Sequence, residues 1–148
     1  MIALTFRETM SGGYHLTTNP TADKPISFTI GVTLPSIAAF LSNILCSIEG
    51  MVTAEGLADH KHLKGTLHID PFRARLLVYQ FEFTDNSGRR LLLQGRKTLD
   101  RGGIVHAMTV LPAGIYDDRG NHIAQALLRF DLRSDLIKFL KSFKLTRA

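Results

Sequence analysis

Residues 76–98 read LLVYQFEFTDNSGRRLLLQGRKT, and this stretch decides the fold class. Its Asp-Asn-Ser-Gly segment is typical of a type I turn with a bulge, which would fold the flanking runs into a β-hairpin. That turn pairs Phe83 with Leu91 and Phe81 with Leu93 on one face. The residues between them are mostly polar and fall on the reverse face. One apolar and one solvated face indicate an antiparallel sandwich or barrel.

Strand patterns recur on both sides of this hairpin. Apolar residues alternate with polar ones over short segments that end at glycine, proline or asparagine. Ser11-Gly12-Gly13 permits a turn or bulge between the first of them and Tyr14, which would open the fold with a hairpin. The sequence therefore predicts an all-β fold, a single antiparallel barrel of about eight to nine strands, as one domain over residues 1–148. The alternating segments outside the hairpin are residues 4–7, 26–33, 46–55, 63–70, 104–111 and 124–130.

Two segments depart from this period of two. Ile37, Phe40, Leu41 and Ile44 have the i, i+3, i+4, i+7 spacing of an amphipathic helix, which predicts a short helix near 36–44. The apolar residues between Leu132 and Phe143 follow the same spacing. They predict a C-terminal helix near 131–145. Packing on the barrel is favoured over the alternative of a helix on a membrane surface, with Lys138, Lys141 and Lys144 beside its apolar residues.

Composition narrows the classes of function. The chain has 148 residues, 45% hydrophobic and 21% charged, which is typical of a globular domain. The net charge is +5, but the basic residues are dispersed and do not alternate with stacking aromatics, so no nucleic-acid partner is expected. A single cysteine excludes an internal disulfide and favours a cytoplasmic location. No apolar run is long enough to predict a transmembrane segment.

Sequence motifs for catalysis are absent. There is no nucleophile elbow, phosphate-binding glycine loop, dinucleotide fingerprint or pair of zinc-binding cysteines. His60-Lys61-His62 places two imidazoles on one side of an extended segment, but no further metal ligands can be named. A solvated loop is the simpler interpretation, and no metal or cofactor is predicted.

Lys97 and His106 are the polar residues that the pattern brings closest to the barrel interior. If Arg101-Gly102 is a two-residue loop, Lys97 faces His106 on the apolar face of the hairpin. Buried together, two such groups disfavour each other's charge, a condition found at functional sites. At the barrel mouth they would stay hydrated, and a slip of one residue in the turn would send one of them outside. These alternatives stay open.

The inward-facing residues of the central strands form the candidate ligand site. An eight-stranded barrel is wide enough either to be filled by its side chains or to hold one small ligand, and the sequence does not decide between these. The predicted ligand-binding residues are Tyr79, Phe81, Phe83, Leu91, Leu93, Lys97, His106 and Met108.

The order of several short segments resembles a known family. Residues 4–12, the Phe40-Leu41 pair, residues 79–83, residues 93–97 and the segment from Asp135 to Phe143 are similar to a lipocalin-like, calycin-type module. That module occurs in bacteria fused to, or encoded near, flavin oxidoreductases of the cholesterol oxidase kind. The resemblance implies a β-barrel that lacks the flavin chemistry, so it supplies no catalytic residue.

This chain departs from the family pattern in the segment from His106 to Leu111. The family tends to have acidic residues and consecutive threonines there, whereas this chain has His-Ala-Met-Thr-Val-Leu. A ligand site shared with the family at these positions is therefore not implied.

Three functions are compatible with these patterns. The first is a non-catalytic barrel that binds a hydrophobic small molecule, lipid or steroid-like, or serves as an accessory to a separate flavin oxidoreductase. The second is a structural or protein-interaction barrel with a filled core. The third is a small barrel enzyme that uses Lys97 and His106, with Tyr79, as acid–base groups. The first is favoured, and the oligomeric state is not predicted.

Overall fold

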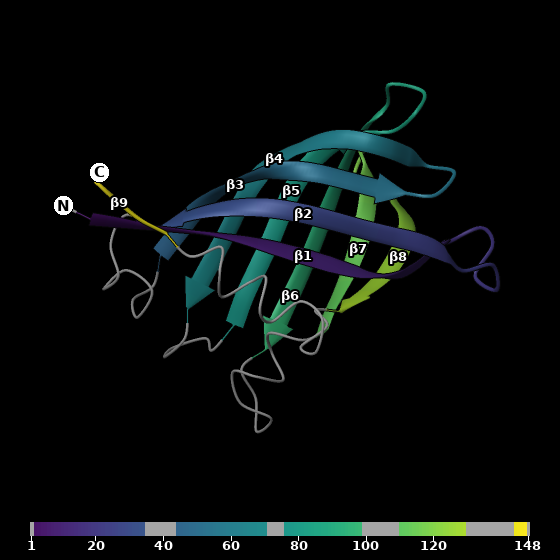
Figure 1. Cartoon of the computed structure of the whole chain (residues 1–148). Helices are drawn as coiled ribbons and strands as arrows, with labels where there is room; N and C mark the ends of the chain where they lie inside the picture. Colours follow the sequence, from purple (N-terminus) through teal and green to yellow (C-terminus); the bar gives the residue numbers. More distant parts are fainter. Residues whose placement is uncertain (1, 35–43, 71–75, 99–109, 130–143, 148) are drawn as a thin grey trace.

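Eight antiparallel strands close into a barrel in the computed structural model of the chain, which describes residues 2–34, 44–70, 76–98, 110–129 and 144–147. Each strand pairs with the next along the chain from β1 to β8, and β8 pairs again with β1 (Figure 1). The strands are β1 (Ile2–Leu16), β2 (Lys24–Leu34), β3 (Ile44–Ala54), β4 (Ala58–Asp70), β5 (Leu76–Thr84), β6 (Arg90–Thr98), β7 (Val110–Asp117), β8 (His122–Arg129) and β9 (Lys144–Arg147).

The predicted central hairpin is confirmed. Phe81 pairs with Leu93 and Phe83 with Leu91, as the turn chemistry requires. The Gly88 N–H donates to the Asp85 carbonyl at 3.0 Å, and Gly88 itself has φ 88°. Glycine adopts this left-handed conformation at little cost, so it forms the bulge of the turn.

Asp85 holds the turn together. Its carboxylate accepts hydrogen bonds from the backbone N–H groups of Ser87 and Arg89, at 2.9 and 2.8 Å, and from the Ser87 hydroxyl at 2.7 Å. Burial raises the pKa of Asp85, but the hydrogen bonds from Ser87 and Arg89 outweigh it and leave the pKa below its usual value. Asp117 accepts the same backbone pattern from Arg119 and Asn121 in the turn between β7 and β8.

The first strand is longer than the sequence suggested. Ser11-Gly12-Gly13 lies within the continuous β1 and forms no turn, which corrects the expectation of a break there. A Cβ at Gly12 would lie 1.9 Å from the Leu127 carbonyl oxygen, so the glycine permits a close approach of β8. This approach, and not a change of chain direction, explains the glycine.

The register between β6 and β7 differs from the one that a two-residue loop at Arg101-Gly102 would give. A two-residue loop at Arg101-Gly102 would bring Leu93 opposite Val110, whereas Leu93 pairs with Ile115. The strand β7 accordingly continues through Pro112 to Asp117, beyond the predicted end at 111. Proline has no backbone N–H to donate and is usually excluded from the middle of a sheet. Pro112 is tolerated in β7 because the pairing of β7 with β6 ends at the neighbouring Ala113.

Both predicted helices fall almost wholly outside the described residues. Of the helix near 36–44, only Ile44 is described, and it begins β3. Of the helix near 131–145, Lys144 and Leu145 belong to β9, where they pair with Thr5 and Leu4 of β1. Ile44, Lys144 and Leu145 are therefore strand residues and not helical, which corrects these three positions of the prediction.

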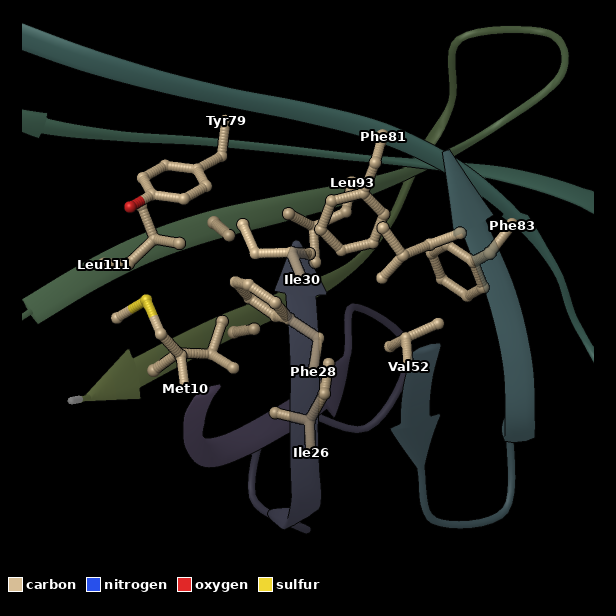
Figure 2. Close-up of a cluster of buried hydrophobic side chains, with 14 of the residues drawn as sticks. Met10, Ile26, Phe28, Ile30, Val52, Tyr79, Phe81, Phe83, Leu93 and Leu111 are labelled. Carbon is tan, nitrogen blue, oxygen red and sulfur yellow. The ribbon is translucent and has the colours of Figure 1, made fainter. Parts of the chain in front are cut away.

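Aromatic side chains from opposite walls meet inside the barrel (Figure 2). Phe28 of β2 contacts Phe81 of β5 with ring centroids 5.2 Å apart, and it contacts Tyr79 at 6.3 Å. Phe81 also lies 5.9 Å from Phe83 on its own strand. Because β2 and β5 are not neighbours in the sheet, these contacts cross the interior. Side chains therefore fill the barrel at this level.

Candidate functional site

Glu8, Tyr79 and Lys97 form a polar cluster with two charged members in the interior of the barrel. Glu8 comes from β1, Tyr79 from β5 and Lys97 from β6. Each has the parity of its strand's buried residues: Glu8 shares a face with Met10, Tyr79 with Phe81, and Lys97 with Leu93. The pleat of three strands therefore directs all three side chains inward.

Glu8 is the centre of this Glu8–Tyr79–Lys97 cluster. The Tyr79 hydroxyl lies 3.0 Å from both carboxylate oxygens of Glu8 and donates to them. The Lys97 ammonium donates to Glu8 Oε1 at 3.1 Å. The Nζ atom of Lys97 also lies 4.9 Å from the centre of the Tyr79 ring, within the range of a cation–π contact.

Burial governs the electrostatics of the cluster. The side chains of Lys97 and Glu8 are only 1% and 8% exposed, so little water screens their charges. Burial raises the pKa of Tyr79 well above its usual value, and the Glu8 charge and hydrogen bond raise it further. Tyr79 therefore remains a neutral hydrogen-bond donor at physiological pH.

The cluster lies toward one end of the barrel. The connections between β3 and β4, between β5 and β6 and between β7 and β8 lie at the opposite end. Lys97 is the penultimate residue of β6, and Tyr79 follows closely after the start of β5 at Leu76. The start of β5 and the finish of β6 lie at the same end of the barrel, where β2, β4 and β8 also finish (Figure 1). The cluster thus lies between the aromatic core and this end.

The structure describes six of the eight predicted ligand-binding residues and brings them together on the inner face of the barrel. All six are buried on the inner face, and Lys97 meets Glu8 and Tyr79 there. His106 and Met108 lie outside the described residues, so the pairing of Lys97 with His106 stays a prediction. The six are Tyr79, Phe81, Phe83, Leu91, Leu93 and Lys97.

Sequence reasoning missed Glu8. A signal was present, since Leu4, Phe6 and Met10 predict an apolar face to which residue 8 also belongs. A carboxylate at an inward position needs a partner, and a buried lysine on another strand is the natural one. The partner could not be named because the two residues are 89 positions apart.

His60 and His62 lie in β4 with exposed side chains, and not in the solvated loop that the sequence favoured. His62 Nε2 lies 2.7 Å from Glu49 Oε1 on the neighbouring strand, and the side chain is exposed. The His60 ring contacts the Thr53 hydroxyl at 3.3 Å. In the described ranges, no three His, Cys, Asp or Glu side chains are grouped so as to bind an ion. Both histidines are therefore explained by surface contacts.

A groove of about 410 Å³ runs over the outside of the barrel where β1, β7 and β8 meet. His15 and Asp23 form an exposed pair at 3.3 Å on its rim, and Arg129 also lines it. Gly12 and Leu127 lie within it, and Leu127 is 43% exposed. None of the six predicted ligand residues that the structure describes contributes to this groove.

No family model matches the chain, and no curated protein or solved structure is significantly similar to it. The closed eight-stranded antiparallel barrel agrees with a lipocalin-like fold, which is the architecture that the resemblance implied. The link to flavin oxidoreductases rests on that resemblance alone. Within the described part of the chain, no helix has the length and hydrophobicity to span a bilayer.

Proposed function

We propose that this chain is a non-catalytic barrel that binds a small, mostly apolar molecule with one polar group, of the lipid or steroid-like class. The ligand lies at the end of the barrel where β4 and β6 finish. Its polar group meets the Glu8–Tyr79–Lys97 cluster, and its apolar part is shielded by the barrel wall.

The observation that carries this proposal is the buried ion pair between Glu8 and Lys97. Removing two charges from water is costly, and a well-packed apolar pair of similar size is often neutral or more stabilising. The rest of the core is mainly apolar, so an apolar pair at these two positions would match its surroundings. Recognition of a ligand's polar group inside an otherwise apolar barrel would explain why the charged pair is present.

The proposed contacts differ in role. The Glu8–Tyr79–Lys97 cluster supplies polar recognition, and Leu93 and Phe81 supply apolar surface below it. Phe83 and Leu91 lie near the turn between β5 and β6, where they support this surface from beneath. Met108 and His106 remain predictions. A ligand that buried about 300 Å² of apolar surface would bind in the millimolar to micromolar range, once association costs are subtracted.

The resemblance extends this proposal to a partner. A barrel that binds a lipid-like molecule could present it to a separate flavin oxidoreductase in the cytoplasm. The accessory role, the enzyme partner and the location all follow from the resemblance and the composition. Catalysis by Lys97 and His106 is not favoured, because Lys97 is held by Glu8.

A second function is supported by the aromatic contacts between Phe28, Tyr79 and Phe81. These rings fill the middle of the barrel, as a structural or protein-interaction module would require. Such a module needs no ligand. The two functions differ in whether any small molecule binds to the folded protein.

A thermal-shift titration with fatty acids, long-chain alcohols and sterols tests the proposed function. A ligand that binds only the folded state raises Tm in a concentration-dependent way. Tyr79→Phe should weaken this shift, because it removes the hydroxyl and keeps the ring. Tyr116→Phe is the matched control, since Tyr116 lies against His122 and away from the cluster. If no compound raises Tm, the filled structural barrel is the better account.

A further inference from the structure

We infer that the polar group of the ligand is an uncharged hydroxyl and not a carboxylate. The inference rests on the proposed function and specifies the chemical class that the same site accepts. It follows from the charge balance of the Glu8–Tyr79–Lys97 cluster and from the Glu8 oxygen that accepts the fewest hydrogen bonds among the described residues.

The cluster already balances its charges. Glu8 contributes one negative charge, Lys97 contributes one positive charge 3.1 Å away, and Tyr79 is neutral. A ligand carboxylate at Lys97 would place a second anion beside Glu8 in surroundings that little water reaches. Like charges at such sites repel strongly because screening is weak. A neutral ligand avoids this cost.

The open position of the cluster is a hydrogen-bond acceptor. Glu8 Oε1 accepts from both Tyr79 and Lys97, whereas Oε2 accepts from the Tyr79 hydroxyl alone among the described residues. A carboxylate oxygen has capacity for more than one donor. Glu8 is also the more exposed member of its ion pair, at 8% against 1% for Lys97. The geometry therefore favours a ligand O–H that donates to Glu8 Oε2.

Three small probes separate the alternatives. Octanol carries the donor, octanoate carries a negative charge at about pH 8, and heptyl methyl ether is an isomer of octanol without a donor. Calorimetric titration of the full chain should give octanol an affinity at least about tenfold above the other two, the ratio that corresponds to about 1.4 kcal/mol. The ether comparison uses the unmodified protein and does not depend on the folding of a variant.

A charge change at Glu8 should reverse the preference. Glu8→Gln removes the negative charge that would repel a ligand carboxylate and keeps the Lys97 ammonium, so octanoate should bind more tightly than octanol. Glu82→Gln is the matched control, because Glu82 is exposed on the outer face and pairs with Arg90. This control should keep the preference of the parent protein.

The outcomes distinguish the two proposals. Octanoate or the ether binding the parent protein as tightly as octanol would overturn the hydroxyl assignment while leaving ligand binding intact. A folded Glu8→Gln variant that keeps the preference for octanol would also overturn it. If none of the probes and no compound of the thermal-shift panel binds, the proposed function itself fails.

Discussion

Lys97 and Arg90 each form an ion pair at 3.1 Å, with Glu8 and Glu82 respectively, in very different surroundings. The side chains of the Arg90 pair are 73% and 63% exposed, whereas those of the Lys97 pair are almost fully buried. Exposed pairs add little stability because water and salt screen them. Breaking a buried pair leaves one charge without its partner. Distance alone therefore does not rank these two interactions.

Replacing Lys97 with methionine should destabilise the protein by about 3 to 5 kcal/mol, because it leaves the Glu8 carboxylate buried without a cation. Arg90→Met should cost at most about 1 kcal/mol. Urea unfolding at equilibrium measures both changes.

The double variant Glu8→Gln and Lys97→Met should recover much of the stability lost in Lys97→Met, since no unpaired charge remains. A double variant no more stable than Lys97→Met would show that the loss came from packing and not from charge.

Strands β2 and β3 approach closely at Gly50, which pairs with Ile30. A Cβ at Gly50 would lie 1.8 Å from the carbonyl oxygen of Thr29, and the obstacle is backbone, which cannot rotate away. The neighbouring Gly31 differs, because a Cβ there would meet only the Glu49 carbonyl oxygen at 3.8 Å. Two glycines on adjacent strands thus have different structural roles.

Gly50→Ala should destabilise the fold by about 3 kcal/mol, since the added methyl forces the two strands apart. Gly31→Ala is the matched control and should change stability by less than about 1 kcal/mol. Thermal and urea unfolding of both variants check this difference. Equal stability of the two variants would mean that the barrel can widen at Gly50 without cost.

At the level of the whole barrel, contacts across the interior join strands that are not neighbours. Phe28 projects from β2 onto Tyr79 and Phe81 of β5 (Figure 2). Glu8 likewise connects β1 to β5 and β6 through Tyr79 and Lys97. The apolar contacts and the polar cluster thus connect distant walls of the barrel.

Truncation of Phe28 tests how completely the interior is filled. Phe28→Ala should cost about 3 to 5 kcal/mol in urea unfolding, as expected for a core phenylalanine whose space cannot collapse. Met51→Ala, on the outer face of β3 and 44% exposed, should change stability by less than about 0.5 kcal/mol. A small effect at Phe28 would indicate that a hollow already adjoins the ring.

The central hairpin and the barrel class were predictable from the sequence, because both depend on local features. The turn residues at 85–88 set the register of β5 and β6, and the period of two assigns each residue to a face. The same parity predicted that Phe81, Leu93 and Lys97 point to one side, which the buried side chains confirm. The register between β6 and β7 could not be predicted, because several loop lengths around Arg101-Gly102 were compatible with the flanking residues.

Only the tertiary structure showed how the walls of the barrel meet. Parity assigns a residue to a face but does not say which distant residue lies opposite, because that depends on the pairing of all eight strands and on closure between β1 and β8. Barrel closure therefore brings Glu8 into contact with Tyr79 and Lys97, which are 71 and 89 residues away in the sequence. It also brings Phe28 into contact with Phe81. The amino-acid pattern determined which side chains point inward, and barrel closure decided which of them touch.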